Sequence, residues 1–153
     1  QIVHGTDGNN WQEATGSKFG PPGPPAAYGH GIAYGTSSDG SCVWVAVGNG
    51  THDIVYSKDG TSWQDTTTGT SKFGGTGGRG IAYGTSSDGS CLWVAVGSGT
   101  HHILYSKDGT SWQDTATGTS KFDGGSGPDI AYGKSSDGNC VWGSVWHGTH
   151  NVL

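Results

Sequence analysis

The chain has little of what several functional classes require. Its 153 residues include no methionine, one arginine and one glutamate, and charged residues make up only 12% of the sequence. So little charge excludes a charged disordered tail, and 31 glycines with 31% hydrophobic residues exclude a helical bundle. No run of 18 or more apolar residues occurs, so membrane insertion is not expected. The turn-dense composition predicts an all-β protein, and the length predicts a single domain.

The charge distribution bears on the partners. The formal net charge is -5, and Arg79 stands apart from six scattered lysines. No basic stripe is available to bind phosphates, so nucleic acid is not expected as a partner. The first residues lack the charged and apolar segments of a signal peptide, and methionine is absent even at the start. We therefore expect a processed, secreted, extracellular protein whose leader has been removed.

What the chain has in abundance is internal repetition. One motif, GIAYGTSSDGSCVWVAVG, begins at residue 31 and returns at residues 80 and 129, a spacing of 49 each time. Trp11, Trp63 and Trp112 form a second set, and their first interval is 52 because FGPPGPPAAYGHG lengthens one loop. The chain is therefore predicted to be a single repeat domain over 1–153. Its units are expected at about 11–55, 63–104 and 112–153, with 1–10 as a partial hairpin.

Each unit has the pattern of short strands separated by tight turns. CVWVAVG, DIVYS, GIAYG and SWQDTTT are β-branched or aromatic runs, and SSDG and KDGT between them are turn signals. Four antiparallel strands in a unit of about 40 to 50 residues are typical of a propeller blade. A β-trefoil also has three units of four strands in about 150 residues, and it is the alternative fold.

The turn sequence also carries a family resemblance. SKDGTSW, at 57–63 and again at 106–112, resembles the Asp-box of sialidase-type β-propellers, although it is one residue shorter. The longer pattern AYGTSSDG…WVAVGSGTHHILYSKDGTSW, at 82–112, is similar to multi-copy propeller repeats of extracellular and surface proteins of aquatic microbes and their large viruses. The resemblance implies a hairpin in which Ser and Asp tie the turn to its own backbone and Trp packs into the blade. Those roles fall on Ser57, Asp59, Trp63, Ser106, Asp108 and Trp112.

Three units are too few for a closed propeller, which has about four to eight blades. The segment 1–11 aligns with 53–63, and 149–153 aligns with 51–55. We therefore expect the strands at 1–3 and 151–153 each to complete a sheet, with at least one pairing made between chains. Two copies joined in this way would form a six-bladed ring with twofold symmetry, and repeated addition would form a filament.

Cysteine and histidine recur with the repeat. Cys42, Cys91 and Cys140 share one position, where a small buried side chain is expected rather than a disulfide or a thiolate metal site. His52, His101 and His150 follow Gly-Thr in the three units. Such a set near an axis is a candidate zinc or copper site, but a histidine at a hairpin edge more often bonds a backbone group or water. No cofactor is expected.

No catalytic constellation is apparent. Sialidases hold the substrate carboxylate with three arginines and use a tyrosine beside a glutamate, whereas this chain has only Arg79 and Glu13. The glycine-rich segment 74–80 is not followed by a predicted helix, so it is not a phosphate loop. The protein is therefore predicted not to be an enzyme.

Two functions remain. In the first, the protein is a self-associating, lectin-like module in which repeated aromatic side chains stack on sugar rings, although a core role is the alternative for each of them. The candidate stacking residues are Trp44, Trp93, Trp142, Tyr34, Tyr83 and Tyr132. In the second, edge strands build an extracellular filament or surface array. Asn49 begins a glycosylation sequon, Asn-Gly-Thr, on a predicted loop.

Overall fold

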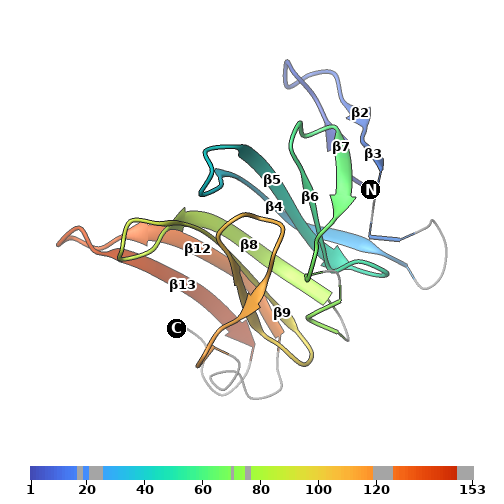
Figure 1. Cartoon of the computed structure of the whole chain (residues 1–153). Helices are drawn as coiled ribbons and strands as arrows, with labels where there is room; N and C mark the ends of the chain where they lie inside the picture. Colours follow the sequence, from blue (N-terminus) through green and yellow to red (C-terminus); the bar gives the residue numbers. More distant parts are fainter. Residues whose placement is uncertain (17–18, 21–25, 70, 75–76, 119–125, 148–153) are drawn as a thin grey trace.

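The computed structural model describes residues 1–16, 19–20, 26–69, 71–74, 77–118 and 126–147 (Figure 1). Within these ranges the chain forms strands β1 to β13 and no helix, which confirms the predicted all-β class. This part of the chain therefore contains no helix long and apolar enough to cross a membrane. The described strands form several small sheets, and none of these sheets closes on itself.

Three sheets follow one another along the chain, preceded by a short hairpin (Figure 1). The N-terminal hairpin consists of β1 (Val3–His4) and β2 (Gln12–Glu13). The first sheet contains β4 (Tyr28–Thr36), β5 (Cys42–Asn49), β6 (Ile54–Ser57) and β7 (Ser62–Asp65), with β3 (Thr15–Gly16) parallel to β7. The second sheet contains β8 (Gly77–Thr85), β9 (Cys91–Ser98), β10 (Ile103–Ser106) and β11 (Gln113–Asp114). The third sheet, as described, contains β12 (Ser126–Lys134) and β13 (Cys140–His147).

The predicted unit of four antiparallel strands is present in the first and second sheets. The strand expected at 151–153, which would add to the third sheet, lies outside the described residues. We call β4, β8 and β12 the inner strands, and we call the pairs β6–β7 and β10–β11 the outer hairpins. The inner hairpins, in which each inner strand pairs with the strand that follows it, share one register. In this register Tyr34 pairs with Trp44, Tyr83 with Trp93 and Tyr132 with Trp142. The apolar run of β5 and β9 lacks strict alternation because both faces of these strands are covered.

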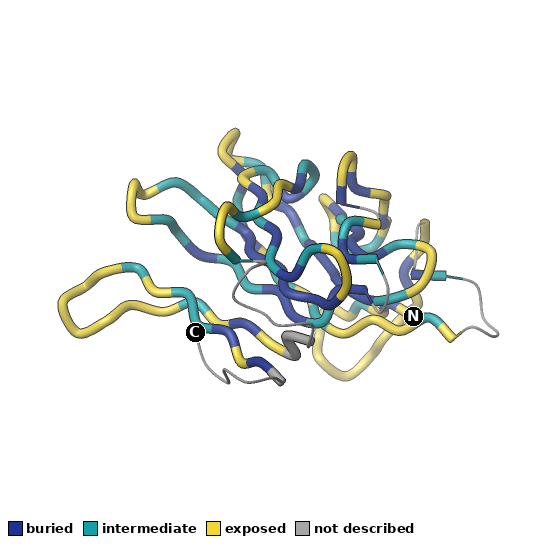
Figure 2. The backbone as a smooth tube through the Cα atoms, turned by 90° about the horizontal axis from the view of Figure 1, so that it is seen from below, coloured by how far each residue is buried: buried dark blue, intermediate teal, exposed yellow. Residues whose placement is uncertain are grey.

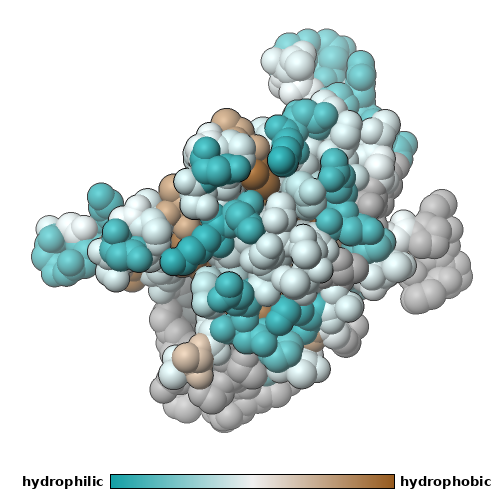
Figure 3. Space-filling model, in the orientation of Figure 1, coloured by the Kyte–Doolittle hydropathy of each residue, from teal (hydrophilic) through white to brown (hydrophobic). Residues whose placement is uncertain are grey.

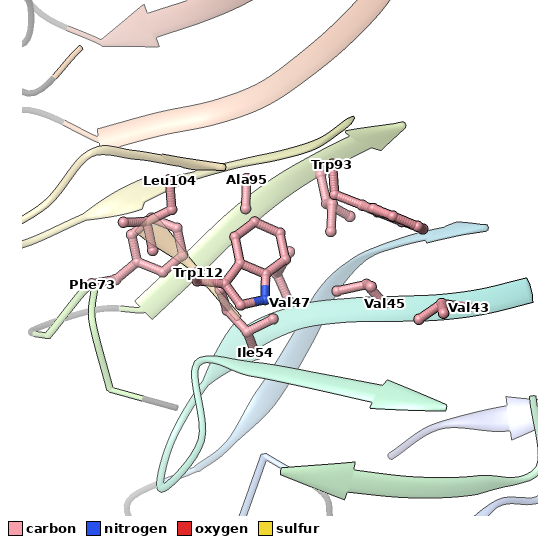
Figure 4. Packing of buried hydrophobic residues seen from close by; sticks show 10 residues of the cluster. Val43, Val45, Val47, Ile54, Phe73, Trp93, Ala95, Leu104 and Trp112 are labelled. Carbon is pink, nitrogen blue, oxygen red and sulfur yellow. The ribbon is translucent and has the colours of Figure 1, made fainter. Parts of the chain in front are cut away.

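Neighbouring sheets pack face to face, and the core lies in the seams between them. Trp112 extends from the second sheet, and its indole lies with Ala95 of β9 on one side and Val47 of β5 on the other (Figure 4). The buried cluster of this seam is Val43, Val45, Val47, Ile54, Phe73, Ile81, Trp93, Ala95, Leu104 and Trp112. On the face shown in Figure 3, hydrophilic residues dominate and apolar residues appear only in narrow strips. Burial of these large side chains holds the sheets together.

A second contact between sheets joins their inner strands. The ring of Tyr83 lies against Gly35, and its hydroxyl donates a hydrogen bond to the carbonyl oxygen of Thr36 at 3.0 Å. The ring of Tyr132 lies against Gly84 in the same way. A Cβ at either glycine would overlap the tyrosine ring, so glycine is required for this close approach. The inner strands β4 and β8 therefore each accept a tyrosine from the sheet that follows.

This contact predicts the effect of adding one methyl group. We expect Gly84→Ala to lower the free energy of unfolding by about 1–3 kcal/mol, because the added Cβ overlaps Tyr132 and the two sheets must move apart. Urea denaturation of dilute protein measures the change. Gly133, the equivalent residue of β12, is the matched control because a Cβ there meets nothing within 4 Å. An equal loss in Gly133→Ala would contradict the steric explanation.

Candidate functional site

The turns that position the outer hairpins are held by one aspartate each. The Asp59 carboxylate accepts hydrogen bonds from the backbone N–H groups of Ser62 at 2.7 Å and Thr61 at 2.8 Å. Ser57 Oγ donates to the same carboxylate at 2.9 Å and accepts from the N–H of Gly60, which has φ of +77°. These bonds, the Ser62 N–H first among them, hold the pKa of Asp59 well below its usual range.

The same turn recurs in the second sheet and in the N-terminal hairpin. Asp108 accepts from the N–H groups of Ser111 and Thr110, each at 2.7 Å. Asp7 accepts from the N–H groups of Asn10 at 2.8 Å and Asn9 at 2.9 Å, and these bonds lower the pKa of Asp7 to about 2. Each turn therefore presents its tryptophan in the same local setting, with Trp11 following Asp7 as Trp112 follows Asp108.

The three equivalent tryptophans differ sharply in burial. Trp63 and Trp112 are each 2% exposed, whereas Trp11 is 60% exposed. Trp112 is covered by the face of the first sheet, and Trp63 by the N-terminal hairpin with Phe19 and Val55. In the part of the chain that the structure describes, no preceding sheet lies beside Trp11. An exposed indole of this size is the kind of side chain that binds a partner surface.

A cavity of about 560 Å³ lies between the second and third sheets, and we call it the intersheet cavity. Its apolar wall includes Leu92, Val94 and Ile103, the equivalents of residues 43, 45 and 54, which surround Trp112 one sheet earlier. Its other lining residues are Ser86, Ser87, Asp88, Tyr105, Lys107, Thr115, Ile130, Trp142 and Ser144. The intersheet cavity thus occupies the place that a hairpin tryptophan fills in the preceding seam.

Two sheet faces also carry exposed apolar side chains. On β4, Ile32 and Tyr34 are about half exposed, although the equivalent Ile81 is buried in the next sheet. On β13, Val141 and Val145 are also about half exposed, although their equivalents in β5 are fully buried. Figure 2 shows the same contrast, because β12 and β13 carry exposed residues along much of their length while buried residues concentrate in the middle of the molecule.

The predicted sugar-stacking residues form three separate pairs. Tyr34 and Trp44, Tyr83 and Trp93, and Tyr132 and Trp142 each have ring centroids 4.7 Å apart. Trp93 is fully buried, and the rings of Tyr83 and Tyr132 are occupied in packing against glycines of the preceding sheet. The pairs of the second and third sheets therefore contribute to the contact between sheets. Trp142 lines the intersheet cavity and Tyr34 is open to solvent, so these two retain a free surface.

The candidate metal ligands lie beside carboxylates of their own sheets. His52 Nδ1 is 3.3 Å from Asp65 Oδ1, and His101 Nδ1 is 3.3 Å from Asp114 Oδ1. His150 lies outside the described residues. Within the described ranges, no group of three or more His, Cys, Asp or Glu side chains has the geometry of a metal site.

The cysteines and the sequon also have defined positions. Burial of all three thiols was expected, but this is wrong: Cys42 is exposed, and Cys91 and Cys140 are partly exposed. The reason is that each stands at the first position of its strand, next to a surface turn. All three thiols are free. Asn49 ends β5, and its side-chain oxygen accepts a hydrogen bond from the N–H of Tyr28 at 2.8 Å; its glycosylation stays a prediction.

The intersheet cavity and the exposed state of Trp11 were not predicted from the sequence. The signal that could have found them is the alignment of 1–11 with 53–63, because it places a hairpin tryptophan before the first complete unit. Comparison with known proteins adds nothing to the geometry: no family model, no curated protein and no solved structure matches the chain.

The aspartate turns predict an acid-dependent stability. A carboxyl whose pKa is lowered in the folded state adds stability above its unfolded pKa, and this contribution is lost as the pH falls through the folded value. We expect Asp59→Asn to lower the melting temperature at neutral pH and to reduce the further fall of the melting temperature as the pH drops below about 4, the ordinary pKa of an aspartate. Thermal melts over this range measure both effects. Asp65→Asn, at the exposed end of β7, is the control, and an identical change there would contradict the role of the turn.

Proposed function

We propose that the protein is a secreted, non-enzymatic module of propeller-type repeats that acts by self-association. The observation that carries this proposal is the pair of half-exposed apolar faces, on β4 and on β13, whose equivalents inside the molecule are buried. Faces that pack on one another within the chain are suited to pack on one another between chains.

Several features support a propeller rather than a trefoil arrangement. The sheets succeed one another face to face, and the inner strands β4, β8 and β12 lie next to each other in order. The outer hairpins share the Asp-box-like turn. A trefoil requires a closed barrel, and the sheets of the described residues stay open. Three such units do not complete a ring, which favours completion by another chain.

The open edge of β13 gives a second reason to expect association. In the first two sheets, β5 and β9 each pair with an inner neighbour on one edge and with an outer hairpin on the other. Within the described ranges β13 pairs only with β12. An unpaired strand edge presents N–H and C=O groups that bind another strand. If the rotation that relates one copy to the next closes on itself, the product is a ring, and if it does not, the product is a filament.

The non-enzymatic character is part of the proposal. The aspartates of the repeated turns are already engaged by backbone N–H groups, and their low pKa values suit them poorly to general acid or base catalysis at neutral pH. Their function in the turns is structural.

Self-association is tested by the mass of the protein in solution. We expect light scattering coupled to size exclusion to give a multiple of the 15.6 kDa chain mass, because the two apolar faces and the β13 edge have no covering partner among the described residues of the same chain. Electron microscopy of the same sample distinguishes rings from filaments. A stable monomer at about 100 µM, an association weaker than about 5.5 kcal/mol, would contradict the proposed function.

Carbohydrate binding is the second candidate function, and the intersheet cavity favours it. Trp142 and Tyr105 offer aromatic surface, while Asp88 and Lys107 offer charged and hydrogen-bonding groups around it. A sugar ring binds to a site of this kind through stacking and through hydrogen bonds to its hydroxyl groups.

A glycan array with the labelled protein tests this second function. We expect bound glycans to be lost in Trp142→Ala, because its indole supplies the stacking surface, and to be retained in His101→Ala, which lies outside the cavity. Absence of any bound glycan at about 10 µM protein, an affinity of about 7 kcal/mol, would contradict carbohydrate binding.

A further inference from the structure

We infer that the intersheet cavity is the binding site for Trp11 of a second copy, whose N-terminal hairpin completes the third sheet. The inference rests on the proposed self-association and identifies its partner and its contacts. In this arrangement β1 of one copy pairs with the open edge of β13 of the other, and two such joints close a ring.

The N-terminal hairpin is equivalent to the outer hairpins of the first two sheets. In β1 and β2, Val3 pairs with Glu13. In β6 and β7, Val55 pairs with Asp65, which is the same register 52 residues later. The indole N–H of Trp11 donates to the carbonyl oxygen of Gly8 at 3.2 Å, as that of Trp112 donates to Gly109 at 3.3 Å. The hairpin is therefore already folded for the position it would occupy.

Trp11 fits the intersheet cavity, because the wall of this cavity is equivalent to the surface that covers Trp112. Trp112 is buried against Val43, Val45 and Ile54 of the preceding sheet. The equivalent residues of the second sheet line the intersheet cavity, as described above, and no tryptophan of an outer hairpin covers them in the described structure. A hairpin added to the third sheet in the common register would place Trp11 at this site.

The register of the first two sheets specifies how β1 would pair with β13. In the first sheet, β6 pairs with β5 so that Ile54 faces Val47 and Val55 faces Ala46. The second sheet has the same register, with Ile103 facing Val96 and Leu104 facing Ala95. Transferring this register by the repeat offsets predicts three pairs between copies, which are Ile2 with Val145, Val3 with Ser144, and His4 with Gly143.

The inner strands support the same joint independently, through the contact between a tyrosine and a glycine. Tyr34 on β4 is open to solvent, whereas Tyr83 and Tyr132 each lie against a glycine of the preceding sheet. Gly133 on β12 is the one equivalent glycine with open space above it, within a hollow of about 340 Å³ that Val141 and Gly143 also line. Pairing of β1 with β13 would bring Tyr34 of one copy over Gly133 of the other.

The position of the N-terminal hairpin makes both contacts possible at once. Ile2 and Ala14 pack with Trp63 and Val55 on the outer half of the open face of the first sheet. The inner half of this face, at β4, is left open by a hollow of about 340 Å³ that Val3, Trp11 and Ile32 line. The pair β12–β13 of the second copy, bound to β1 through β13, would lie in that hollow and over β4. The same two strands thus satisfy the edge of β1 and the face of β4.

The number of copies follows from the number of repeats. Two copies supply six units, within the range of about four to eight that closes a propeller, while three copies would supply nine. A twofold ring uses both joints of each copy and leaves no face of this kind exposed. The expected assembly is therefore a closed dimer.

A disulfide test probes the joint directly. In the seam between the second and third sheets, which we call the second seam, Thr85 Oγ1 lies 3.5 Å from Cys140 Sγ. The equivalent pair across the proposed joint is Lys134 of one copy and Cys42 of the other. We expect Lys134→Cys, with Cys91 and Cys140 changed to Ala, to form a covalent dimer on mild oxidation that dithiothreitol reverses, because the equivalent side chains of residues 85 and 140 are in contact.

Matched controls accompany this test. Thr85→Cys, with Cys42 and Cys91 changed to Ala, should form a disulfide with Cys140 within one chain and keep the monomer mass on a denaturing gel. Adding Cys42→Ala to the Lys134→Cys variant, in which Cys91 and Cys140 are already Ala, should give no covalent dimer. A ladder of larger covalent species would overturn the closed dimer. Association without the disulfide would overturn this joint but leave self-association in place, and absence of association would remove both.

Substitutions at the two contacts complete the test. We expect Trp11→Ala to weaken dimerisation about 30-fold or more, as for a buried tryptophan at the centre of an interface. Gly133→Ala should also weaken it, because a Cβ there meets the incoming Tyr34. The melting temperature of dilute, monomeric protein should stay unchanged in both variants, since both sites are open within one chain. Full dimerisation in Trp11→Ala would overturn the inference.

The chain's own last residues provide one more distinction. By the repeat offset, Val152 is the equivalent of Ile103, so the segment that contains it is the rival strand for the edge of β13. We expect Val152→Pro to leave dimerisation unchanged, because β1 of the second copy supplies the pairing. Loss of the dimer in Val152→Pro, with Trp11→Ala without effect, would assign the edge to this segment and overturn the inference.

Discussion

The structure depends on the packing of one sheet face against the next. A sheet of two to five short strands cannot bury its apolar residues by itself, and here side chains of the following sheet pack across the seam onto the preceding one. Trp112 and Tyr83 perform this function between the first and second sheets, the tryptophan at the outer strands and the tyrosine at the inner ones. The aspartate turns are subordinate to this packing, because they fix the hairpin that carries the tryptophan.

This dependence explains how far the sequence could be interpreted. The Asp-Gly turns and the β-branched runs predicted the strands of the first two sheets, because turn geometry and strand preference are local properties. The 49-residue repeat indicated equivalent positions in different units, and the register of β4 with β5 does recur in β8 with β9. Burial was not predictable in the same way. Trp11 and Trp112 follow similar turns, yet Trp11 is exposed and Trp112 is buried, because among the described residues the face of a preceding sheet covers Trp112 and none covers Trp11.

The aromatic residues show the same limit. Equivalent positions in a repeat share their chemistry, so the sequence indicated six aromatic side chains as one class of candidates. In the structure this class divides by location. Trp93 lies in a closed seam, Trp142 lines a cavity, and Tyr34 is open to solvent. A repeat therefore specifies which side chains meet when sheets pack, while the number and order of the sheets decide which of them remain free to bind.

The two proposed functions compete for one space. The intersheet cavity has room for a sugar or for the indole of another copy, and the wall formed by Leu92, Val94 and Ile103 is common to both. A hairpin that enters there brings both a buried indole and a row of backbone hydrogen bonds, whereas a sugar brings stacking and hydroxyl contacts alone. Association should therefore displace a bound glycan from this cavity. A protein that binds sugar while assembled must do so elsewhere, on the outward turns rather than in the seam.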